Sequence, residues 1–175
     1  MTYPILKFPH GKENGFTLIE IMVTLAITGF IALGAAVSSA QVLNQTTRNS
    51  DFTTASRNAM NASYWVGRDA QMAQVFSGAA GFPETSDLSM AWEDWDNVSH
   101  NVTYSLEDGR LFRTYTVGGQ STSAMIAEYI NENSDMTYCT SDNGTLVFTI
   151  TSSVGQGSKI IDVTRTREVT ARPQL

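Results

Sequence analysis

The chain has 175 residues, a formal net charge of −6 at pH 7 and a single cysteine, Cys139. That length accommodates one folded domain and one helical anchor, but not two full hydrophobic cores. The acidic surplus disfavours sequence-independent binding to nucleic acid, which relies on Lys and Arg at phosphates, and a lone cysteine excludes an intramolecular disulfide.

The N-terminal region consists of a short leader with Lys7 and Lys12, followed by an apolar segment from residue 16 to residue 37. No residue from 21 to 47 carries a charge, and the apolar segment is long enough to cross a bilayer as one helix. Positive residues precede this span, and the first charge after it is Arg48. The cytoplasmic bias of positive residues therefore predicts a single-pass membrane protein with the leader inside and the head outside.

Glu20 is the one carboxylate near the start of this apolar segment. An acidic side chain in lipid costs about 2.5–3.5 kcal/mol on insertion scales, and such residues are usually paired or functional. The chain offers no basic residue shortly downstream, so the sequence predicts that Glu20 is neutralised by another molecule. This pattern indicates assembly rather than catalysis.

The string Gly15-Phe16-Thr17-Leu18-Ile19-Glu20 resembles the N-terminal signature of type IV prepilins and type II secretion pseudopilins. The resemblance extends to about Val37. It implies that prepilin peptidase cleaves between Gly15 and Phe16 and methylates the new amino group of Phe16. It also implies that Glu20 attracts the terminal amine of a neighbouring pilin or pseudopilin in a filament.

An ordinary secretory signal or a plain anchor is the alternative, because the small residues 35–40 imitate a signal-peptidase site. The apolar run exceeds a normal signal core, however, and this alternative leaves Glu20 unexplained.

No proline occurs between Pro9 and Pro83, so one helix is predicted from Phe16 to about Phe76. Its membrane or filament-core part is residues 16–37, and residues 38–76 form an amphipathic continuation. The apolar stripe of that continuation comprises Phe52, Ala55, Ala59, Ala62, Val66, Ala70 and Ala73.

Two polar features interrupt the amphipathic part. Short polar side chains in residues 44–54 favour non-helical backbone, so a bend or frayed turn is predicted there. Arg68 and Asp69 are adjacent, so they diverge by about 100° on a helix and are predicted to face the sheet or solvent, with support of a neighbouring subunit as the alternative.

Residues 77–175 are predicted to form an antiparallel β head. Asp108-Gly109 is a hairpin signal, and Ser141 to Gly144 marks a second turn. The expected strands are Asn101–Leu106, Arg110–Val117, Ala124–Ile130, Met136–Thr140, Thr145–Ser152 and Lys159–Thr170. The predicted fold class is therefore α+β: a long N-terminal helix packed on a small antiparallel sheet, a pilin-like lollipop that looks like the J-type minor pseudopilin domain.

Residues that could carry chemistry are few. The histidines are His10 and His100, and no HExxH, CxxC or glycine-rich phosphate loop occurs, so the sequence predicts no enzyme, no catalytic residue, no metal and no cofactor. The segment from Trp92 to Asn97 combines three acids with two tryptophans but lacks regular calcium-loop spacing. It is predicted to be a solvated loop with tryptophan anchored on the core. Trp92 and Trp95 as contacts for a partner are the alternative.

The resemblance implies a minor pseudopilin near the tip of a type II secretion-like filament, because Val37 stands where major pilins typically carry proline. Two alternatives remain. One is a minor pilin of a type IV pilus or competence system, serving adhesion, motility or DNA uptake. The other is a membrane-tethered binding module that does not polymerise.

Overall fold

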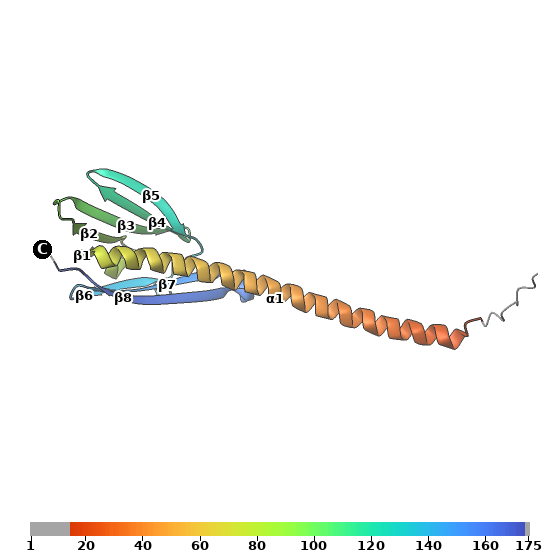
Figure 1. The fold of residues 1–175 in the computed structure, drawn as a ribbon. Coiled ribbons are helices and arrows are strands. Elements are labelled where there is room, and N and C mark those ends of the chain that lie inside the picture. The colour runs from red at the N-terminus through yellow and green to blue at the C-terminus, as the bar shows by residue number, and fades with distance from the viewer. Residues whose placement is uncertain (1–14, 174–175) are drawn as a thin grey trace, which may run out of the picture. The chain divides into compact units, whose positions relative to one another are not determined.

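The computed structural model describes residues 15–173, which contain one long helix, α1 (Leu18–Met72), followed by two antiparallel sheets (Figure 1). The described chain divides into two compact units, one ending at Gln45 and one beginning at Thr46, and each is taken separately below. The predicted α+β, pilin-like layout of a long helix packed on antiparallel β structure is confirmed.

The first unit contains the start of α1. Thr17 accepts a hydrogen bond at its Oγ1 from the Glu20 backbone N–H at 3.4 Å, so Thr17 caps the helix. All residues from 15 to 50 are exposed. Within residues 15–173, α1 is the one helix that is long and apolar enough to cross a membrane, judged by length and composition.

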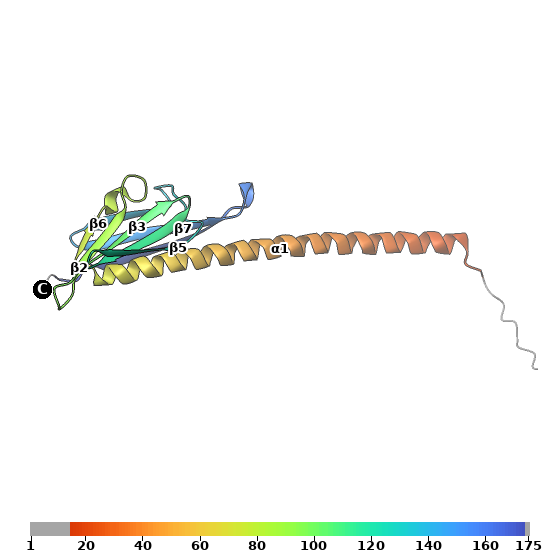
Figure 2. The same cartoon turned by 90° about the horizontal axis from the view of Figure 1, so that it is seen from above.

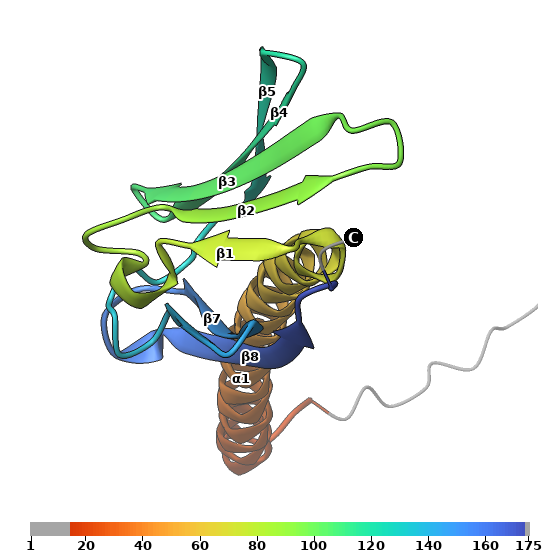
Figure 3. The same ribbon diagram turned by 90° about the vertical axis from the view of Figure 1, so that its left-hand side faces the viewer.

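The second unit buries the apolar stripe of α1 against both sheets. The predicted stripe is confirmed for all members except Phe52, which is 55 % exposed; those buried are Ala55, Ala59, Ala62, Val66, Ala70 and Ala73. Five of these six buried residues are alanines, and their small side chains allow the strands to pack closely against the helix. Figure 2 shows this half of α1 beneath the strands, and Figure 3 shows β1 to β3 on one side of it and β7 and β8 on the other.

The helix differs from prediction at two places. Residues 44–54 are helical throughout, without a frayed turn, and Thr53 Oγ1 donates to the Asn49 carbonyl at 2.8 Å. Such side chains bond back to the helix instead of competing with it. The helix ends at Met72 rather than near Phe76, because Val75–Ser77 forms strand β1 and pairs with the next strand.

The larger sheet, called sheet A, is a meander in the order β1-β2-β3-β4-β5. Asp108 and Gly109 both have positive φ and form the predicted hairpin turn. Strand β4 has the predicted bounds, whereas β1 and β2 were not predicted and β5 begins four residues before its predicted start at Ala124, directly after the turn Gly118-Gly119. The strands after β1 are β2 (Leu88–Glu93), β3 (Ser99–Glu107), β4 (Arg110–Val117) and β5 (Gln120–Ala127).

The smaller sheet, called sheet B, has the order β6-β7-β8. Six strands on one small sheet were predicted, whereas the described residues form eight strands in two antiparallel sheets. Together the two sheets bury one face of α1, while Met60 and Tyr64 on its other face are exposed. The remaining elements are β6 (Tyr138–Asp142), β7 (Thr145–Val154), β8 (Ile161–Thr170) and the 3-10 helices η1 (Ala79–Gly81) and η2 (Gly157–Lys159).

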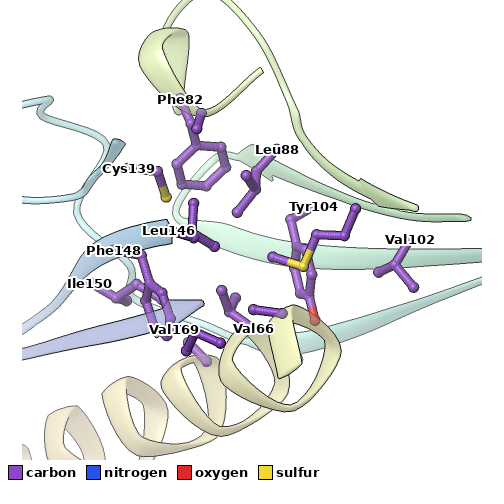
Figure 4. Close-up of a cluster of buried hydrophobic side chains, with 14 of the residues drawn as sticks. Val66, Phe82, Leu88, Val102, Tyr104, Cys139, Leu146, Phe148, Ile150 and Val169 are labelled. Atoms are coloured by element: carbon purple, nitrogen blue, oxygen red, sulfur yellow. The ribbon is translucent and has the colours of Figure 1, made fainter. Parts of the chain in front are cut away.

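The core lies between the two sheets and the helix (Figure 4). Tyr104 from sheet A and Phe148 from sheet B are its largest fully buried side chains. Other members labelled in the figure are Val66, Phe82, Leu88, Val102, Cys139, Leu146, Ile150 and Val169.

Candidate functional site

The motif residues Gly15, Phe16 and Glu20 lie together at the start of α1. Gly15 and Phe16 precede the first helical residue, and the Phe16 side chain is largely exposed. Glu20 is exposed in the first helical turn and forms no ion pair with residues 15–173. Glu20 thus lies four residues after Phe16, in the first turn of the helix that follows the predicted cleavage position.

The residues around Glu20 also fit a local pattern of helix starts. Thr17-Leu18-Ile19-Glu20 fits the capping-box pattern, in which a Thr and a Glu three residues later satisfy free N–H groups at a helix start. One half of that box is formed by the bond from the Glu20 N–H to Thr17 Oγ1. A negative charge in the first turn also interacts favourably with the helix dipole. Helix capping is therefore a reason for an acid at this position that is separate from the subunit pairing predicted from the sequence.

The two tryptophans of the β2–β3 segment have different environments. Trp92 is 8 % exposed and its ring stacks on His100, with centroids 5.2 Å apart, whereas Trp95 is 81 % exposed. The geometry follows from β2, whose alternate residues Leu88, Met90 and Trp92 face the core. A partner that binds this loop would therefore contact Trp95, whereas Trp92 packs in the core beneath the loop.

Asp94 organises this loop through its carboxylate. Its Oδ1 accepts bonds from the backbone N–H groups of Asp96 and Val98, both at 3.0 Å, and its Oδ2 lies 3.0 Å from His100 Nε2. With Nε2 donating to Asp94, His100 Nδ1 accepts from the Tyr115 hydroxyl at 2.6 Å. These contacts, led by the His100 hydrogen bond, hold the pKa of Asp94 below its ordinary value.

The acidic residues of the β2–β3 loop do not form a cluster of metal ligands. Among residues 15–173, no group of three or more His, Cys, Asp or Glu side chains is placed to hold an ion. Asp94 directs its oxygens to backbone N–H groups and to His100, so the acidic segment closes on itself as a loop.

Acidification is expected to open this loop. Because the pKa of Asp94 is lowered on folding, its contribution to loop stability is present above the ordinary value of 3.8 and is lost as the pH falls below it. We expect the peptide containing Asp96 and Val98 to lose hydrogen-exchange protection below that pH.

The chain contains a matched control loop. Asn133 closes the segment before β6 in the same way, since its Oδ1 accepts from the Asp135 N–H at 2.8 Å. An amide does not titrate, so protection of the Asn133 loop should not respond to this pH change. Equal pH responses of the two loops, or an unchanged response in Asp94→Asn, would contradict the assignment.

A buried charge network, which the sequence did not predict, joins α1 to sheet A. Asp69 is 1 % exposed and accepts two bonds from Arg113, from Nε at 2.6 Å and from Nη2 at 2.9 Å. The Tyr104 hydroxyl donates to Asp69 Oδ2 at 2.5 Å. The Asp69 hydrogen bond raises the pKa of Arg113, while burial and the nearby carboxylate raise that of Tyr104 well above its usual range.

Aromatic rings surround the guanidinium of this network. Arg113 lies over the rings of Trp65 and Tyr115, at 5.2 and 5.3 Å from their centroids, and Arg68 lies over Trp65 at 5.3 Å. Asp69 thus faces the sheet, as one of the two readings of Arg68 and Asp69 predicted, and Arg68 is exposed. One signal in the sequence could have predicted this network. Asp69 lies three residues after Val66, on the face of the helix that carries the buried stripe, and a buried acid there requires a cationic partner from the sheet.

Comparison with known proteins identifies one family model. The model of the prokaryotic N-terminal methylation motif matches residues 11–36. No curated protein and no solved structure matches the chain. The match covers the predicted cleavage position, Glu20 and most of the apolar segment, and it suggests a structural subunit rather than an enzyme. The motif and the apolar helix α1, which begins within the matched residues, support a type IV pilin-like or pseudopilin-like protein that is anchored in a membrane.

Proposed function

We propose that this chain is a minor pseudopilin of a type II secretion-like filament, processed by prepilin peptidase and assembled near the filament tip. The observation that carries the proposal is the methylation motif, which leads directly into the exposed apolar half of α1. In this proposal residues 1–15 are the leader, 16–37 the filament-core helix, 38–76 its amphipathic continuation and 77–175 the head.

Processing creates the group that assembly requires. The leader keeps the precursor in the inner membrane, cleavage after Gly15 releases the amine of Phe16, and methylation of Phe16 follows. The amine of one subunit then lies beside Glu20 of its neighbour. Removing one partner from such a buried pair commonly costs about 3–5 kcal/mol, so charge sets the register while apolar packing supplies adhesion.

Two further features support the proposals that this chain is a minor subunit and that it belongs to a secretion system. Val37 occupies the position at which major pilins carry proline, and a long helix followed by antiparallel strands is the arrangement of the J-type subunits. The partners in this proposal are the other pseudopilins of the filament, the peptidase and the inner membrane. Trp95, exposed on the β2–β3 loop, is the side chain we assign to contact with a neighbour.

Intact-mass analysis of membrane-extracted protein tests the processing step. We expect the mature chain to lack residues 1–15 and to carry the mass of one additional methyl group. Gly15→Leu should retain the leader, because a bulky side chain then occupies the cleavage position. Gly11→Leu is the matched control within the leader and should be cleaved normally.

The outcomes separate the candidate functions. An intact leader in a cell with an active peptidase would contradict the proposal and leave a membrane tether. Correct processing followed by co-purification with pilus subunits, rather than secretion subunits, would contradict the type II assignment alone.

A further inference from the structure

The side of α1 that faces away from the two sheets is uncovered in the head (Figure 2). Its exposed residues recur at spacings of three and four, so they lie along one side of the helix. No Asp, Glu or Lys occurs from residue 52 to residue 68. This side therefore carries positive charge and apolar surface without negative charge, at Arg57, Met60, Tyr64 and Arg68.

Strand β8 adds two more arginines on the side of sheet B that meets α1. Arg165 and Arg167 pair with the core residues Ile150 and Phe148, and cross-strand partners project from the same face of a sheet. Both arginines are exposed, because β8 is an edge strand. The acids of β8 occupy alternate positions and face the other way. We call the combined surface the arginine face; it comprises Arg57, Met60, Tyr64 and Arg68 of α1 with Arg165 and Arg167 of β8.

Gly67 makes room for one of these arginines. Glycine inside a helix costs about 1 kcal/mol relative to alanine, and its presence there usually has a packing or functional reason. A Cβ at Gly67 would lie 2.6 Å from Nη1 of Arg167, closer than two nonbonded atoms can approach. The missing side chain thus lets the Arg167 guanidinium lie against the helix. Arg68, the next residue of α1, lies over the Trp65 ring at 5.3 Å from its centroid.

The arginines of this face have no acidic partner within residues 15–173. The ion pairs of that range join Asp94 to His100 and Asp69 to Arg113, outside the arginine face. The rest of the head is acidic, since residues 77–157 contain eleven acids against two arginines. Positive charges gathered without counter-ions repel one another. The arginine face is therefore complementary to an acidic surface.

We infer that the arginine face is the contact surface for an acidic patch on the head of a different pilin-like subunit. Its composition is that of a protein contact, because Arg, Tyr and Met are enriched in interface cores, whereas Lys, Asp and Glu are depleted there. A lipid or nucleic-acid phosphate layer would also meet the acids of this head, which repel it. That the partner is a filament subunit rests on the proposed function, in which the neighbours of a minor subunit are other subunits.

The two kinds of residue in the arginine face have different roles in this contact. Met60 and Tyr64, which are 57 % and 55 % exposed, supply the apolar centre from which water is excluded. The guanidinium groups around them donate paired hydrogen bonds to carboxylates of the partner. Apolar burial therefore supplies adhesion, and the arginines select an acidic partner and set its orientation.

Photo-cross-linking in cells that express the full chain together with the other filament subunits tests the contact. Tyr64 is replaced by benzoylphenylalanine, and mass spectrometry identifies the linked peptide. We expect a peptide that contains Asp or Glu and belongs to another pilin-like subunit. Tyr138, an exposed tyrosine on β6, is the matched control position and should not link to that peptide. No link from position 64, or links only to this chain, to lipid or to nucleic acid, would overturn the proposal.

Charge reversal tests the electrostatic part of the contact. Arg167→Glu should lower the yield of the cross-link from position 64 about tenfold or more, because like charges then face each other. Arg110→Glu changes the net charge equally at an exposed position next to the β3–β4 turn, and it should leave the yield unchanged. Replacing the linked acid of the partner by arginine should restore the cross-link in Arg167→Glu. Equal yields from the two arginine variants, or no restoration, would refute the charge complementarity.

Intact mass and co-purification of the same samples separate this inference from the proposed function. A chain that lacks residues 1–15 and co-purifies with the filament, but gives no cross-link from position 64, would reject the arginine face alone. A retained leader would reject the proposed function and, with it, a filament subunit as the partner.

Discussion

Replacing Asp69 by alanine is expected to lower the free energy of unfolding of the head by about 3–5 kcal/mol, because it leaves the partly buried Arg113 guanidinium without its counter-ion and the buried Tyr104 hydroxyl without its acceptor. Asp69 is almost fully buried and accepts bonds from Arg113 and Tyr104. The loss would be a large fraction of the stability of a typical domain. Urea unfolding of the full chain in detergent, followed by tryptophan fluorescence, measures it.

Two control variants separate the loss of the Asp69–Arg113 ion pair from the loss of an acidic side chain in general. Glu168→Ala removes an exposed acid from β8 and should change stability by less than about 0.5 kcal/mol. The double substitution Asp69→Leu with Arg113→Leu removes both charges, and it should recover much of the stability lost in Asp69→Ala, because well-packed apolar residues can replace a buried pair. A single-variant loss below about 1 kcal/mol would mean that the network contributes as little as a surface ion pair.

Replacing Glu20 by alanine is expected to permit cleavage after Gly15 but to abolish most incorporation into the filament. The neighbouring amine would then lie in apolar surroundings without its partner, at a cost of about 3–5 kcal/mol. That cost corresponds to a population change of two orders of magnitude or more. Co-purification of tagged filament subunits with the variant measures incorporation, and intact mass confirms processing.

Glu20→Gln separates the two roles of this residue. Glutamine serves the third helical position of a capping box as glutamate does, but it carries no charge. If charge pairing drives assembly, Glu20→Gln should fail to incorporate as Glu20→Ala does. Normal incorporation of Glu20→Gln with loss in Glu20→Ala would assign the residue to helix capping and reject the pairing.

Features encoded by neighbouring residues were predictable from the sequence. The methylation motif, the apolar span, the alanine stripe and the Asp108-Gly109 hairpin each depend on spacings of a few residues, and β4 has its predicted bounds. Residues 44–54 show the limit of such reasoning. Their low helix propensity suggested a break, but a helix that continues on both sides and side chains that bond back to it outweigh propensity.

The sequence by itself identified the methylation motif, the apolar segment long enough to cross a membrane and the face of the helix that is buried, because those properties depend on local composition and period. Only the tertiary structure decided that Asp69 pairs with Arg113, 44 residues away, that Trp92 is buried while Trp95 is exposed, and that Arg167 lies against Gly67. The reason is physical. The partner of a buried charge and the neighbours of a strand are set by the order of strands in a sheet, and that order depends on which distant segments together exclude the most water.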